Sequence, residues 1–215
     1  MSDPFFNALL IAHITAGVIS LAAAGIALAS DKGARIHRRF GRIYVIAMLT
    51  VSISALLLAL QALNGFLLMV SVFTFYLIFT GWRAATARSG TEGRLDRTIG
   101  IGVGLVSIGM MGWGVFLLSS GITHPSITLI VFGFIGTVLP ISDWRHWKRG
   151  PIRGKSRIAR HLSRMIGGTI ATLTATAVVN LEHWPDTVVW LGPTALLTPV
   201  ILWWTARLDR SSEPS

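Results

Sequence analysis

Apolar residues in this chain are gathered into seven long runs that short polar segments separate. A bilayer core about 30 Å thick requires roughly 20 mostly apolar helical residues to cross it, and each run is about that long. The pattern therefore predicts an all-α integral membrane bundle that forms a single domain over residues 1–215. The seven predicted transmembrane helices cover residues 5–29, 41–63, 66–87, 98–120, 125–142, 161–181 and 187–207.

The segments between these runs are predicted to be loops and turns. The longest, Asp143 to Arg160, is expected to be a loop, whereas Asn64-Gly65 and Gly121 to His124 are short enough for turns between antiparallel helices. The first run is longer than the apolar region of a signal peptide, which is about 7–15 residues, and the segment before it is acidic. We therefore expect the first run to be retained as a helix.

The composition agrees with a membrane protein. Hydrophobic residues make up 52% of the chain, charged residues only 13%, and the mean hydropathy is +0.64. A soluble domain has about 25% charged residues, so an ordinary soluble globule is excluded. The chain contains no cysteine, which also excludes disulfide scaffolds and thiolate metal sites.

The net charge of +10 has an explanation in topology. If the N-terminus is outside, all 19 lysine and arginine residues fall on the inner side, within residues 32–42, 83–97, 145–164 and 207–210. Because basic residues in short loops favour the cytoplasmic side, the pattern predicts an outside N-terminus, a cytoplasmic C-terminus and a multi-pass protein of a bacterial-type inner (cytoplasmic) membrane.

The same basic residues indicate partners. The lipid bilayer and the anionic lipids of its cytoplasmic leaflet are the expected partners, and nucleic acid is not. Three arginines are candidates for contact with an anionic head group or ligand: Arg38, Arg42 and Arg164.

The sixth run carries a polar stripe at helical spacing. Its members recur at steps of three and four, which places them on one helix face. One explanation is a polar pathway in a small transporter or ligand sensor; the other is that the hydroxyl groups bond back to their own helix. The proposed pathway residues are Thr169, Thr172, Thr176 and Asn180, between His161 and His183.

Histidine is the remaining candidate for chemistry. Haem iron takes axial ligands such as His or Met, and His13 lies within a predicted span, with Met110 at similar depth. The main hypothesis is a protein that binds haem b or acts in membrane redox chemistry through a site between the first, second and sixth helices. The candidate cofactor ligands are His13, His37, His161, His183 and Met110.

A second alternative is a metal-dependent membrane hydrolase. Zinc takes three or four His or Asp ligands, and His37, His146, His161 and Asp143 are predicted near the inner face. Their spacing is not that of a zinc motif, so no metal ligand and no catalytic residue is assigned.

Two basic segments suggest an internal duplication. Arg35-Ile36 with Arg42 matches Arg157-Ile158 with Arg164 at equal spacing. The helices before and after the fourth run also follow the same order of directions, which fits a parallel repeat.

Several motifs resemble a family of predicted bacterial membrane proteins, domain of unknown function 2306. The resemblance lies in His13-Ile-Thr-Ala-Gly17, in the segment from Lys32 to Tyr44, and in His161-Leu-Ser-Arg164-Met165 with Asn180. It implies no particular activity, but the helical pattern is similar to that of membrane b-type cytochromes. The functional positions that it implies are His13, His37, Arg38, His161 and Arg164.

Overall fold

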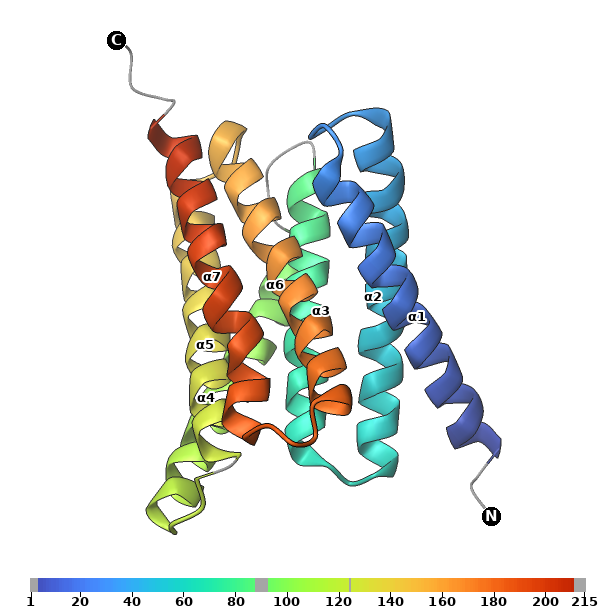
Figure 1. The fold of residues 1–215 in the computed structure, drawn as a ribbon. Coiled ribbons are helices and arrows are strands. Elements are labelled where there is room, and N and C mark those ends of the chain that lie inside the picture. The colour runs from blue at the N-terminus through green and yellow to red at the C-terminus, as the bar shows by residue number, and fades with distance from the viewer. Residues whose placement is uncertain (1–3, 88–92, 124, 211–215) are drawn as a thin grey trace. The chain divides into compact units, whose positions relative to one another are not determined.

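A computed structural model describes residues 4–87, 93–123 and 125–210, which form seven α-helices and no strand (Figure 1). All seven helices are long and apolar enough to cross a membrane, which confirms the predicted all-α membrane fold. They are α1 (Pro4–Ala29), α2 (Arg35–Gln61), α3 (Gly65–Thr86), α4 (Arg94–Ser119), α5 (Ser126–Arg149), α6 (Gly154–Asn180) and α7 (Asp186–Arg210).

The helices continue into the polar segments that flank the predicted spans. The prediction of a loop from Asp143 to Arg160 was wrong, because α5 runs on to Arg149 and α6 begins at Gly154. Hydropathy identifies the part of a helix that suits hydrocarbon, whereas the helix itself ends where its hydrogen-bond ladder ends. Here Gly150, with φ of 105°, terminates α5.

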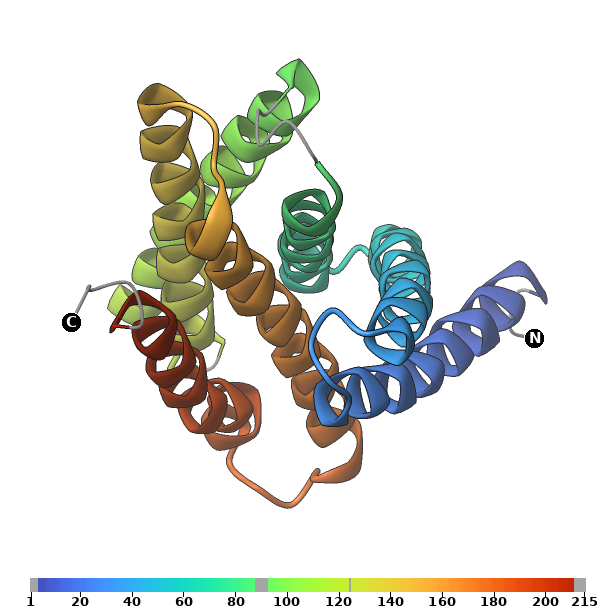
Figure 2. The same cartoon turned by 90° about the horizontal axis from the view of Figure 1, so that it is seen from above.

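Contacts divide the chain into two compact units, residues 1–78 and 79–215, and the division falls within α3. In the first unit, α1 and α2 pack along each other as an antiparallel hairpin, side by side in both views (Figures 1 and 2). In the second unit, α4 pairs with α5 and α6 pairs with α7. The single domain over residues 1–215 stays a prediction.

Glycine sets the close approach of α4 and α5. A Cβ atom on Gly133 would lie 2.7 Å from the carbonyl oxygen of Ser107, and one on Gly114 would lie 2.8 Å from that of Ser126. Gly109, by contrast, has nothing within 4 Å. Small residues where two backbones meet are typical of membrane helices. Such helices gain little from exchanging contacts with lipid tails for contacts between apolar side chains.

Large apolar side chains are exposed on several helices. In α1, Ile11 is 65% exposed and Val18 is 64% exposed; in α7, Leu196 is 76% exposed and Trp203 is 60% exposed. In water such a surface would drive aggregation, whereas in a membrane it contacts lipid tails.

Candidate functional site

Basic side chains from the following segment close the C-terminal end of α1. Lys32 Nζ donates to the carbonyl oxygen of Leu28 at 2.5 Å, and His37 Nδ1 donates to that of Ala27 at 2.9 Å. The last carbonyls of a helix have no partner within it and form the negative end of its dipole. His37, a predicted cofactor ligand, is therefore part of a helix cap.

The C-terminal end of α3 is closed in a similar way, by residues of α6. The Arg157 guanidinium donates to the carbonyl oxygens of Ala84 and Ala85, each at 2.5 Å. His161 Nδ1 donates to the carbonyl oxygen of Gly81 at 2.9 Å. Both basic residues thus attach the start of α6 to the end of α3.

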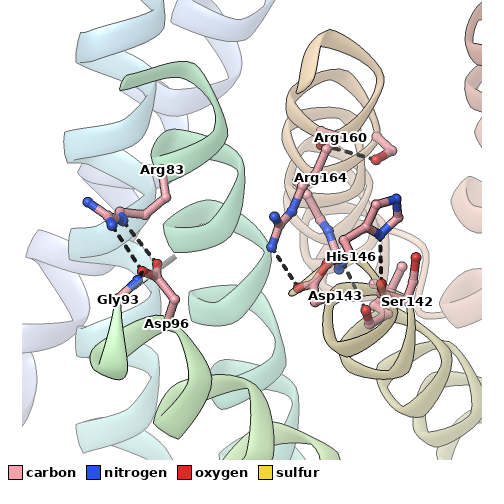
Figure 3. Close-up of polar contacts among 10 residues, drawn as sticks. Arg83, Gly93, Asp96, Ser142, Asp143, His146, Arg160 and Arg164 are labelled. Atoms are coloured by element: carbon pink, nitrogen blue, oxygen red, sulfur yellow. Dashed lines mark hydrogen bonds and ion pairs between the residues drawn. The ribbon is translucent and has the colours of Figure 1, made fainter. Parts of the chain in front are cut away.

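A buried carboxylate in α5 holds two arginines of α6. Asp143 is only 2% exposed; its Oδ2 lies 3.0 Å from Arg160 Nη2 and its Oδ1 lies 2.9 Å from Arg164 Nη2 (Figure 3). Arg164 also donates to the carbonyl oxygen of Leu139 at 3.2 Å. Arg164, predicted to contact an external anion, therefore contacts an anion that belongs to the chain itself.

A second ion pair connects α3 with α4. The Arg83 guanidinium bonds both carboxylate oxygens of Asp96, each at 2.9 Å, and the same carboxylate accepts the backbone N–H of Gly93 at 2.7 Å (Figure 3). Asp96 is not among the residues predicted from the sequence. An acidic residue three positions after a helix start is a capping signal that would have found it.

His13 is held between α1 and α2. Its Nδ1 lies 3.0 Å from the hydroxyl oxygen of Ser54 and 3.2 Å from the carbonyl oxygen of Val51. Since a carbonyl oxygen only accepts, a hydrogen bond to Val51 requires the proton on Nδ1, and in that neutral tautomer Nε2 holds the lone pair. Histidines that bind metals commonly donate their other ring nitrogen to a carbonyl or carboxylate in this way.

The other predicted cofactor ligands lie elsewhere. Met110 is fully buried in α4, and His183 is exposed in the turn after α6. His124 lies outside the described residues. Because a site between the first, second and sixth helices would join the two units, it stays a prediction.

The polar stripe of α6 is satisfied within its own helix. Each of the four proposed pathway residues donates to the carbonyl oxygen four positions earlier, at distances between 2.7 and 3.2 Å. This bonding back to the helix accounts for the stripe without a pathway. The residues are Thr169, Thr172, Thr176 and Asn180.

Four exposed arginines at the start of α2 line an open hollow of about 470 Å³. We call this feature the arginine hollow; Ile43 and Ile46 complete its lining. In the described part of the chain, none of these arginines forms an ion pair or a hydrogen bond through its side chain, unlike Arg164. The arginines are Arg35, Arg38, Arg39 and Arg42.

The proposed zinc ligands are not brought together in the part of the chain that the structure describes. No group of three or more His, Asp or Glu residues there is arranged to hold a metal ion. His146 instead donates from Nδ1 to the carbonyl oxygen of Ser142 within α5, at 2.7 Å (Figure 3).

Fold and site together define a seven-helix membrane protein with clustered arginines at helix ends. Residues 10–94 match the model of a family described as predicted membrane protein (DUF2306). The match confirms the resemblance over the part that contains His13, His37 and Arg38, and it does not extend to His161 and Arg164. No curated protein and no solved structure matches the chain.

Replacing the buried carboxylate tests how far the second unit depends on it. We expect Asp143→Asn to lower the free energy of unfolding by about 3–5 kcal/mol, because it leaves the buried Arg164 and the partly buried Arg160 without their countercharge. The measurement is an unfolding titration in mild detergent. Glu182→Gln, at an exposed position, is the control, and an equally small effect of both variants would contradict this account.

Proposed function

We propose that the chain is a multi-pass protein of the cytoplasmic membrane with its N-terminus outside and its C-terminus in the cytoplasm. The proposal is supported by the seven membrane-length helices together with the distribution of the basic residues. These residues occupy the connection from α1 to α2, the starts of α2, α4 and α6, and the ends of α3, α5 and α7. Such a bias toward one side is the feature that sets orientation.

The absence of native cysteine makes this orientation easy to test. We expect Glu182→Cys, after α6, to react with a membrane-impermeant maleimide in intact spheroplasts. Arg149→Cys, at the end of α5, is expected to react only after the membrane is opened. Both positions are exposed, so accessibility within the protein is matched. The opposite labelling pattern would reverse the orientation.

We infer that the arginine hollow binds an anionic group of a lipid or small ligand. The observation that supports this most directly is four exposed arginines around one hollow without an acidic partner in the described residues. Like charges one helical turn apart repel each other, so these side chains are stabilised by an anion placed among them. Guanidinium groups also match phosphate and carboxylate geometry through paired hydrogen bonds.

Topology alone does not account for the arginine hollow. Orientation requires basic residues on one side of the membrane, but it does not require four of them on two turns of one helix. The arginines of α6 show the usual solution for a cluster of this kind, since Asp143 lies between two of them. At α2 no acidic side chain among the described residues pairs with the arginines, so an anion from another source can compensate them.

Charge-neutral variants test anion binding at this hollow. In nanodiscs of neutral phosphatidylcholine, we expect Arg38→Gln/Arg42→Gln to bind phosphatidic acid at least about tenfold more weakly than the unaltered protein, because two charge-assisted contacts are lost. Bound lipid is measured by native mass spectrometry.

The matched control is Arg145→Gln/Arg149→Gln, which removes the same charge from exposed positions of α5. This control is expected to retain binding. Equal losses in both double variants would show attraction to net charge alone and would contradict a site at α2. Raising the ionic strength should weaken binding to the unaltered protein, because salt screens exposed charges over about 8–10 Å.

A second candidate function, binding of haem b, is favoured by the geometry of His13. Its Nδ1 is engaged by Val51 and Ser54, which orients the ring and leaves Nε2 as the nitrogen for an axial ligand. The residues proposed from the sequence as the opposite ligand are Met110 and His183, whereas His37 and His161 are proposed for a second site near the inner face. When bound, haem would supply one-electron transfer within the membrane.

An absorption spectrum tests this candidate. Protein purified from haem-replete cells should show a Soret band, and His13→Ala should remove it or shift it, whereas His146→Ala should leave it unchanged because that side chain bonds within its own helix. A spectrum without a Soret band would exclude haem binding under these conditions.

The transporter and hydrolase alternatives have no comparable observation in their favour. The four proposed pathway residues of α6 each donate a hydrogen bond to a carbonyl oxygen of their own helix, and the described residues hold no cluster of metal-ligand type. Both alternatives stay predictions from the sequence.

A further inference from the structure

One arginine pattern occurs twice in the chain, as Arg-Ile-x-Arg-x-x-x-Arg. It begins at Arg35 at the start of α2 and again at Arg157 in the first turn of α6. In the second copy, the last two arginines lie one helical turn apart and hold one carboxylate. Arg160 contacts one oxygen of Asp143 and Arg164 contacts the other. A pair of arginines at this spacing therefore suits a single oxyanion.

The first copy has the arginine pair without the acid. Arg38 and Arg42 correspond to Arg160 and Arg164, but α1, the helix before α2, contains no Asp or Glu. Both arginines are exposed and line the arginine hollow. The position that a carboxylate takes in the second unit thus has no counterpart among the side chains of α1.

A further pair stands beside it in α2. Arg35 and Arg39 are also four residues apart and line the same hollow. The hollow is therefore bordered by two pairs of the kind that holds Asp143, and the two pairs overlap along the helix. Two pairs side by side suit two oxyanions that are joined to each other.

The lining becomes apolar farther along α2. Ile43 and Ile46 border the hollow, Ile46 is 67% exposed, and Ile53, two turns on, is 50% exposed. A ligand with an anionic head at the arginines can therefore lay an apolar chain along these isoleucines. A soluble anion would not contact these isoleucines, which would then face lipid tails like the other exposed apolar side chains.

We propose that the arginine hollow recognises an amphiphile whose head carries two adjacent phosphate groups and whose tail is a hydrocarbon chain. The inference rests on the proposed anion binding at α2 and adds to it the class of ligand. One phosphate lies between Arg38 and Arg42, as Asp143 lies between Arg160 and Arg164, and the second lies between Arg35 and Arg39.

Binding of three probes to the full chain in neutral phosphatidylcholine nanodiscs tests the proposal by titration calorimetry. The probes are farnesyl diphosphate, farnesyl monophosphate and inorganic pyrophosphate. We expect farnesyl diphosphate to bind at least about tenfold more tightly than either of the others, because each lacks one set of contacts.

Two double variants test which arginine pair contacts the second phosphate. Arg35→Gln/Arg39→Gln should abolish the preference for diphosphate over monophosphate while monophosphate still binds. Arg145→Gln/Arg149→Gln should keep the preference. Because all four positions are exposed, these variants are expected to fold, and their helical circular dichroism should match that of the unaltered protein.

The outcomes distinguish failure of the two-phosphate inference from failure of the proposed anion binding. Equal affinity for farnesyl diphosphate and farnesyl monophosphate would overturn the two-phosphate inference and leave anion binding in place. If pyrophosphate bound as tightly as farnesyl diphosphate, the inference that the ligand carries a hydrocarbon tail would be overturned. If none of the three probes bound, and phosphatidic acid did not bind either, the proposed anion binding itself would be overturned.

Discussion

The structure depends on one constraint: polar groups at the edge of a low-dielectric core must find partners inside the protein. Unpaired backbone carbonyls and unpaired charges are costly there. The ends of α1 and α3 meet this constraint with side-chain donors, from Lys32 and His37 in one case and from Arg157 and His161 in the other. Asp143 meets it for two arginines of α6.

This constraint also explains the roles of histidines that the sequence offers as candidate cofactor ligands. His37 and His161 are cofactor candidates by residue type, yet each donates to a backbone carbonyl near the end of a neighbouring helix. His13 differs because it lies within α1 and bonds across to α2, away from a helix end. Histidines of the same type thus separate into caps and one candidate ligand only when their partners are known.

The arginines separate by the same criterion. Those of α6 are compensated by a carboxylate or by helix carbonyls, whereas those of α2 border a hollow without an acidic partner in the described residues. Charge that a protein does not neutralise internally is available for recognition. The contrast between two similar segments is therefore more informative about function than the net charge of the chain.

The amino-acid sequence by itself determined the fold class and the seven helices, because a span of about 20 apolar residues has few alternatives in a bilayer. It did not determine where the helices end, since the polar extension of α5 to Arg149 has no hydropathy signal. Only the tertiary structure decided which arginines are neutralised. Arg42 and Arg164 are alike in sequence, and they differ because Asp143 on another helix lies 2.9 Å from one of them.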